Sequence, residues 1–200
     1  KTSLDSFANP RTAGIIALTT DLEDGVIDAK ISDGMSDIFL ATKEGMSIRF
    51  NEADVRGMGR SARGVKGMTL GKDDTVIGIE VLEKGTPDTI LMVTESGYGK
   101  RSPNDEYRVQ SRGGVGIITQ KTTDKVGNVV STRAVLDTDE AIITTDKGQT
   151  IRMNCSDISL VGRNTQGVRL ITLNPDEKVT GLALISDDSA PAGRSLRMGA

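Results

Sequence analysis

The sequence predicts an all-β protein of the propeller kind, built from about four copies of one unit of four short antiparallel strands. Three observations lead to this prediction. A glycine followed by a β-branched residue recurs every 50 to 52 residues. A threonine followed three residues later by glycine recurs with a similar period, and the apolar runs between these motifs are short. Repeats of about this length with four short strands are typical of propeller blades.

The two motifs mark equivalent positions in successive units. The glycine pairs are Gly14-Ile15, Gly64-Val65, Gly116-Ile117 and Gly167-Val168, and the threonine motifs are Thr42…Gly45, Thr94…Gly97 and Thr145…Gly148. Each threonine motif is followed by an arginine and, six positions later, an apolar residue: Arg49 and Val55, Arg101 and Tyr107, Arg152 and Ile158. Lys1 and Phe7 occupy these two positions in the first unit. We therefore expect a fragment that begins and ends within a unit.

The strands can be placed in the unit that runs from Gly64 to Tyr107. Alternating or continuous apolar residues predict strands at 64–70, 76–81, 90–94 and 98–101, and Gly97 supplies the positive φ of a tight hairpin. The other units repeat the pattern at 26–27, 38–42 and 47–50, and again at 129–130, 141–144 and 150–153. The constant offsets argue against two unrelated β-sandwiches. A closed ring and an open arc both remain possible.

The rare residue types restrict the chemistry. The chain has one cysteine and no histidine, which excludes a disulfide framework and argues against a zinc or other transition-metal site. Without histidine, Ser-His-Asp and Cys-His mechanisms are excluded. We expect no catalysis in this chain, no cofactor and no metal. The apolar runs are too short to cross a membrane, and the single cysteine fits a reducing, cytoplasmic compartment.

Charge is distributed unevenly along the units, although the net charge is −3. Acidic residues gather at turns such as Asp73 and Asp74, or Asp21, Glu23 and Asp24, whereas basic residues gather where units join. In a propeller these junctions lie at equivalent heights around the rim, so we predict a curved basic surface, separate from the acidic turns, that binds the phosphates of a bent duplex. The predicted DNA-binding residues are Arg49, Arg60, Arg63, Lys66, Lys100, Arg101, Arg112, Arg152, Arg163 and Arg169.

The sequence also bears on two other kinds of partner. Aromatic residues are only 2% of the chain, which does not suit single-stranded nucleic acid, because single strands are held by stacking on aromatic rings. A propeller that binds a protein partner remains the alternative from a different class. It predicts an apolar patch on the rim or top face, and no such patch is evident in the sequence.

One segment carries a family resemblance, formed by Gln110, Ser111, Arg112, Gly113, Gly114, Val115 and Gly116. It resembles the Gln-Arg-Arg-Gly-Gly-Lys-Gly box that marks the C-terminal domain of the bacterial DNA gyrase A protein. The stretches 97–101, 158–168 and 11–14 are also similar to that domain. Ser111 and Val115 stand where the box has arginine and lysine, and the full box that precedes the first blade in the family is absent.

This resemblance implies a β-pinwheel, a six-bladed propeller variant whose blades exchange strands and which wraps duplex DNA. Residues 1–185 would form the last four blades of such a domain. Residues 186–200 are rich in Ser, Ala, Gly and Arg, a composition that predicts a disordered tail, and in the family the C-terminal tail can modulate wrapping. The parent would be an ATP-hydrolysing type IIA topoisomerase, in which the gyrase A and B proteins form a heterotetramer at the nucleoid. Its ATPase and DNA-cleaving tyrosine would lie outside this chain. The related domain of topoisomerase IV is the nearest alternative.

Overall fold

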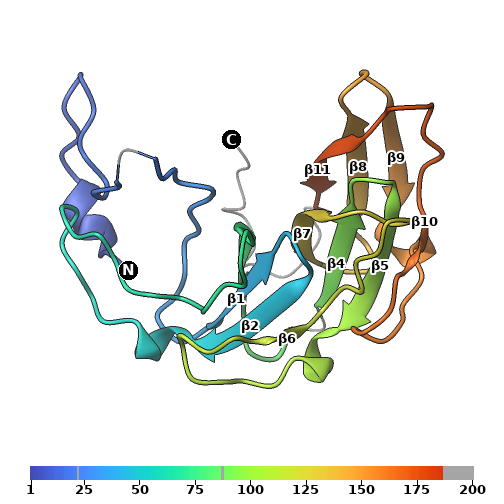
Figure 1. Cartoon of the computed structure of the whole chain (residues 1–200). Helices are drawn as coiled ribbons and strands as arrows, with labels where there is room; N and C mark the ends of the chain where they lie inside the picture. Colours follow the sequence, from blue (N-terminus) through green and yellow to red (C-terminus); the bar gives the residue numbers. More distant parts are fainter. Residues whose placement is uncertain (22, 87, 187–200) are drawn as a thin grey trace.

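Eleven strands in three antiparallel sheets form the described part of the chain, residues 1–21, 23–86 and 88–186 of a computed structural model (Figure 1). The first sheet has the order β3 (Val76–Leu82), β1 (Asp37–Thr42), β2 (Met46–Asn51), β6 (Ile117–Ile118). The second has the order β10 (Val168–Arg169), β5 (Tyr98–Pro103), β4 (Thr89–Thr94), β7 (Val129–Val135). The third has the order β11 (Val179–Ile185), β8 (Glu140–Thr145), β9 (Thr150–Asn154).

Neighbouring units exchange strands. β6 lies between β5 and β7 in the sequence, and both of those belong to the second sheet, yet β6 pairs with β2 of the first sheet. In the same way, β10 leaves its own unit and pairs with β5 through Val168 and Gly99. The repeat pairs Gly116-Ile117 and Gly167-Val168 therefore each lead into a short strand, β6 or β10, that completes the sheet of the preceding unit. This exchange confirms the predicted all-β pinwheel class.

The threonine motifs form the hairpin turns of the three sheets. In each turn the glycine N–H donates to the threonine carbonyl, over 3.0 Å in the first and second hairpins and 3.1 Å in the third. Gly45, Gly97 and Gly148 have φ values of +86°, +78° and +84°, a conformation that favours glycine. The strand register shifts at Thr42, Thr94 and close to Thr145. The motif thus encodes a turn and an adjoining irregularity in the pairing.

Apolar side chains fill the seams, by which we mean the junctions between neighbouring units. Tyr107 and Ile158 follow the single-turn 3-10 helices η3 (Asn104–Glu106) and η4 (Cys155–Asp157), and they are 1% and 2% exposed. The Tyr107 ring meets Phe39 edge to face, with ring centroids 5.0 Å apart. Cys155 is buried in the seam between the second and third sheets, where burial raises the pKa of its thiol to about 11. The thiol therefore stays protonated as part of the core.

Two of the expected strands, 26–27 and 64–70, do not form, so the described residues contain three sheets where the sequence predicted about four blades. Strand exchange explains both differences. Among the described residues before Asp37 no hairpin forms, so these segments have no neighbouring sheet edge with which to pair. The first unit accordingly consists of loops and the 3-10 helix η1 (Leu4–Phe7), at the left of the open arc in Figure 1. Of the predicted tail, 186–200, only Ser186 lies within the described residues.

Candidate nucleic-acid interface

The predicted cations fall into distinct structural groups. The first comprises the arginines that follow the hairpin turns, here called the hairpin arginines: Arg49, Arg101 and Arg152. Arg49 donates from NH1 to the carbonyls of Asn104 (3.0 Å) and Tyr107 (3.2 Å), in the next unit. Its Nε donates to a carboxylate oxygen of Asp37 over 2.9 Å. Arg49 therefore joins β2 to the turn around η3.

The other two hairpin arginines differ from each other in burial and in partners. Arg101 donates from Nε to the carbonyl of Ile158 (3.1 Å), the equivalent of Tyr107, and forms an ion pair with Asp137. It is 4% exposed. Arg152 pairs with Glu140, and its side chain is 61% exposed. Because Arg49 and Arg101 are used inside the domain, we remove them from the proposed interface.

Lys100 is also used inside the domain. Its side chain is fully buried, and its Nζ donates to the carbonyls of Gly162 (3.0 Å) and Arg163 and to the hydroxyl of Thr165 (3.1 Å). Desolvation by burial lowers the pKa of Lys100 to about 8; the carboxylate of Glu106 opposes this shift and the Arg163 guanidinium adds to it. Lys100 does not reach the surface, so it too leaves the proposed interface.

Three predicted arginines occupy equivalent places in successive seams and are here called the seam arginines: Arg60, Arg112 and Arg163. Each stands four residues before a repeat glycine. Each donates from NH1 to the carbonyl two residues after the glycine of the preceding unit: Arg60 to Ile16 (2.9 Å), Arg112 to Lys66, and Arg163 to Ile118 (2.6 Å). All three are partly exposed. Because a carbonyl is neutral, these contacts hold the guanidinium groups without cancelling their charge.

The box-like loop, 110–116, lies against the preceding unit. The N–H of Gly113 donates to the carbonyl of Gly67, and the N–H of Thr69 donates to the carbonyl of Gly114, each over 2.8 Å. Ser111 and Val115 are exposed. The two positions that depart from the family box therefore face solvent, and Arg112 is the cationic side chain that this loop presents.

Arg169 belongs to a second cationic group, around Tyr98 on β5. One guanidinium N–H of Arg169 donates to the Tyr98 hydroxyl (3.2 Å), and its guanidinium carbon lies 5.6 Å from the ring centroid. Lys125, which is absent from the predicted set, lies 5.4 Å from the same centroid. The hydrogen bond from Arg169 lowers the pKa of the Tyr98 hydroxyl. Lys125 follows Asp124 in a turn, and no repeated motif marks this position.

The remaining predicted cations lie near the first seam. Lys66 is exposed. Arg63 is also exposed, but it pairs with Asp21 over 2.9 Å. The prediction that acidic turns stay apart from the basic junctions was therefore wrong at Asp21.

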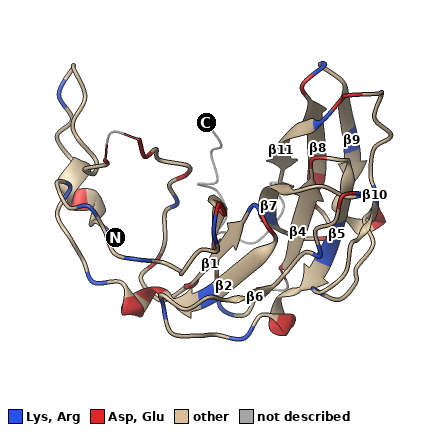
Figure 2. Cartoon of the chain, in the orientation of Figure 1, with Lys and Arg blue, Asp and Glu red and all other residues tan. Residues whose placement is uncertain are grey.

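The 3-10 turns η2 and η3, which carry acidic residues, also contact the seam arginines. Nε of Arg112 donates to the backbone carbonyl of Asp54 (3.3 Å), in the segment η2 (Glu52–Asp54). The backbone N–H of Arg163 donates to the carboxylate of Glu106 (2.7 Å). Along the lower edge in Figure 2, the red turns η2 and η3 alternate with blue stretches of the 107–116 loop. Basic and acidic positions therefore alternate along this edge (Figure 2), whereas the sequence predicted a curved basic surface separate from the acidic turns.

Two exposed arginines at the seams are missing from the predicted set. Arg56 and Arg108 each follow the apolar seam residue, Val55 or Tyr107, by one position, and both are exposed. Their separation of 52 residues matches the repeat period. Both belong to the basic residues that gather at the junctions in the sequence, although the predicted DNA-binding set does not include them.

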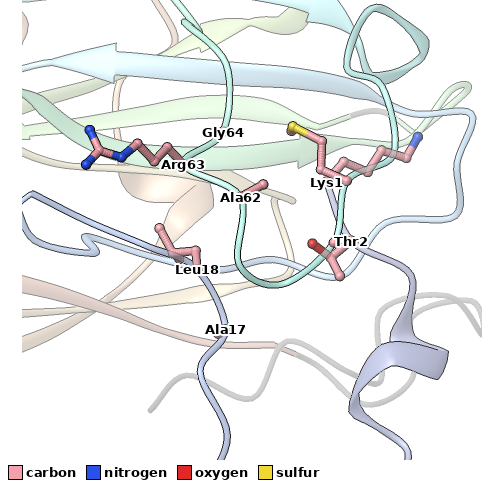
Figure 3. A pocket seen from close by; sticks show the side chains of 9 residues that line it. Lys1, Thr2, Ala17, Leu18, Ala62, Arg63 and Gly64 are labelled. Carbon is pink, nitrogen blue, oxygen red and sulfur yellow. The ribbon is translucent and has the colours of Figure 1, made fainter.

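A small-molecule site is not favoured. A shallow hollow in the first unit is lined by Lys1–Thr2, Ala17–Leu18, Met58–Gly59 and Ala62–Gly64. Figure 3 shows the side chains of Lys1 and Arg63 extending in opposite directions around it. Within the described residues, no cluster of three or more His, Cys, Asp or Glu side chains could hold a metal ion. No helix there is long and apolar enough to span a bilayer.

Comparison with known proteins agrees with the repeat structure. The family model described as "DNA gyrase C-terminal domain, beta-propeller" matches residues 36–83, 88–135 and 139–186, so that each match contains one hairpin and the strand β3, β7 or β11. The chain belongs to this family. It is 44% identical over 194 residues to the DNA gyrase A protein of Haloquadratum walsbyi, and 40% identical over 189 residues to that of Staphylococcus aureus strain MRSA252. These alignments cover 96% and 94% of this chain but 23% and 21% of the relatives.

Solved structures agree with this family assignment. The structure titled "Structure of DNA gyrase A C-terminal domain" superposes with a TM-score of 0.79 at 27% identity, over 87% of this chain and 59% of that one. The C-terminal domain of DNA topoisomerase IV gives a TM-score of 0.86 at 22% identity, over 92% and 57% of the two chains. The second likeness shows the shared fold alone. The gyrase C-terminal family is therefore supported by sequence and by structure.

Proposed function

We propose that this chain binds the phosphate backbone of duplex DNA along its seams and bends the duplex, with little preference for sequence. The observation that carries the proposal is the threefold repetition of the seam arginines, each held by the same carbonyl contact. Neutralising phosphates releases condensed counterions, which favours binding to any sequence. Smoothly bending a site of 20–30 base pairs costs about 1 to 6 kcal/mol, so several such contacts are needed to offset the cost.

In the longer protein of which we propose this chain to be a part, residues 1–185 belong to a six-bladed domain of a gyrase A protein. The wrapped DNA is presented to the cleavage core during ATP-driven negative supercoiling. The rest of the gyrase A protein supplies DNA cleavage and the gyrase B protein supplies ATP hydrolysis, so this chain needs no cofactor of its own. Its place is the nucleoid in the cytoplasm. The identity to gyrase A relatives favours gyrase over topoisomerase IV.

The proposal can be tested by titrating the chain with linear duplexes of increasing length at several salt concentrations. We expect the affinity to fall steeply with salt, because each phosphate contact contributes about 0.9 to the slope of log K against log salt concentration. We also expect the affinity at fixed salt to rise with duplex length until the duplex is long enough to contact all the seams. Unrelated sequences of equal length should bind alike.

The competing interpretation, a propeller that binds a protein partner, makes the opposite prediction in the same titration. No binding at low salt, or binding that is insensitive to salt, would favour a protein partner. A strong preference for one duplex sequence would contradict a backbone-binding surface. The length dependence separates wrapping from simple electrostatic attachment, since attachment at one seam should saturate on a short duplex.

A further inference from the structure

Lys100 interrupts the repeat at a core position. The residue before each hairpin arginine is Ile48 in the first sheet, Lys100 in the second and Ile151 in the third. Ile48 is fully buried, as is Lys100. A buried ammonium group carries a large desolvation cost unless polar partners compensate for it. Since isoleucine fills the same place in two of the three sheets, the fold itself does not require a lysine there.

The partners of Lys100 are all in one loop of the neighbouring unit, Gly162–Thr165. The carbonyls of Gly162 and Arg163 and the hydroxyl of Thr165 accept from its Nζ. These three acceptors match the three donors of an ammonium group. The loop is also closed on itself, because the Thr165 hydroxyl donates to the Gly162 carbonyl over 2.8 Å. Lys100 thus binds the core-facing side of the loop, through the two carbonyls and the hydroxyl that accept from its Nζ.

The same loop carries a seam arginine. The Arg163 backbone N–H is bound by Glu106, and its guanidinium reaches the carbonyl of Ile118. The main chain of Arg163 is therefore held on one side by Glu106 and on the other by Lys100. The guanidinium itself is partly exposed. An arginine fixed at its backbone in this way loses less conformational freedom when it binds a phosphate.

We propose that Lys100 is a positioning residue, which orders the Gly162–Thr165 loop so that Arg163 is presented to a phosphodiester oxygen of DNA. The part that concerns DNA rests on the function proposed above, whereas the ordering of the loop does not. Lys100 acts through Arg163 and does not touch the nucleic acid. Arg112, the seam arginine of the preceding unit, has no such support, because isoleucine occupies the equivalent position in the first sheet.

The proposal is tested with Lys100→Met, made in the full chain of 200 residues. This substitution keeps the approximate length of the side chain and removes its charge. Amide hydrogen exchange of residues 162–166 is measured without DNA, and the affinity for duplex DNA is measured separately. We expect loop exchange to become about tenfold faster, the factor typical for loss of a hydrogen bond to a charged group. We also expect the affinity to fall, and Arg163→Ala to cost less in the variant than in the parent.

Ile48→Met is the matched control, since it places the same residue at the equivalent core position and should leave the 162–166 loop unchanged. Thr165→Val removes one acceptor and keeps the experiment informative if Lys100→Met does not fold. Unchanged loop exchange in both Lys100→Met and Thr165→Val would overturn the proposal. Additive losses of affinity from Lys100→Met and Arg163→Ala would also overturn it. Failure of the parent chain to bind DNA would instead reject the proposed function, and loop exchange would still decide whether Lys100 orders the loop.

Discussion

Gly116→Ala should lower the free energy of unfolding by about 2 to 5 kcal/mol, whereas the equivalent change Gly64→Ala should lower it by about 1 to 2 kcal/mol. Both glycines have positive φ, +85° and +93°, so both substitutions carry the cost of a left-handed conformation. At Gly116 a Cβ would also lie 2.2 Å from the carbonyl oxygen of Ser47 on β2. At Gly64 nothing lies within 4 Å of that position. The difference arises because Gly116 leads into β6, which pairs with β2 of the preceding unit, whereas Gly64 leads into no strand.

Urea denaturation of the two variants and the parent provides the measurement. Gly167→Ala serves as a second test, because a Cβ there would lie 2.5 Å from the carbonyl oxygen of Gly99 on β5. We expect it to behave like Gly116→Ala. Equal losses of stability for Gly64→Ala and Gly116→Ala would mean that the close approach of β6 to β2 contributes nothing to the fold.

Changing all three seam arginines to alanine (Arg60→Ala, Arg112→Ala, Arg163→Ala) should lower the affinity for DNA more than any single substitution among them. Each seam arginine donates to a neutral carbonyl at an equivalent place in its seam, so this contact does not cancel its charge. If each neutralises one phosphate, removing three should make the slope of log K against log salt less steep by about 2.7. The loss should be equal for unrelated DNA sequences, because phosphate contacts carry no sequence information. Fluorescence anisotropy with labelled duplexes over a range of salt concentrations provides the measurement.

A control for net charge is available in the turns. Lys72, Lys84 and Lys147 are exposed, and changing all three to alanine removes the same total charge. We expect this control to retain most of the affinity and salt slope of the parent. If the two triple variants lose the same amount of affinity for DNA, then the net charge of the chain governs binding and the seam arginines have no specific role. Circular dichroism checks that the variants keep their β structure, since the seam arginines also bind carbonyls.

The repeat motifs made the hairpins predictable from sequence. Thr42 and Gly45 identified the first turn, and the arginine and apolar residue that follow them identified the seam. Only the family resemblance implied strand exchange. The repeat pattern alone could not show that Gly116 begins a strand in another unit's sheet, because an intra-unit strand and an exchanged strand have the same local pattern. For the same reason the segment 64–70 was predicted as a strand. Its residues have strand propensity, but no hairpin forms beside them in the described part of the first unit.

The charged residues were located by sequence but not sorted by environment. Arg49 and Arg101 recur at one repeat position and Arg60 belongs to another, and the spacing does not show which of the two positions is buried. The structure separates them by their partners: Arg101 is buried against the carbonyl of Ile158, whereas Arg60 is partly exposed on a carbonyl of the preceding unit. Burial depends on contacts between units, which a repeat period does not encode. Lys100 was misplaced for this reason, since charge alone suggested an exposed residue.

The most direct test of the account is the end-to-end distance of a bound duplex of about 30 base pairs, measured by energy transfer between dyes at its two ends. The account predicts that binding at low salt shortens this distance. The triple seam-arginine variant should produce less shortening at equal occupancy, and added salt should reverse the change. Tight binding that leaves the duplex straight would contradict the claim that the seams hold a bent double helix.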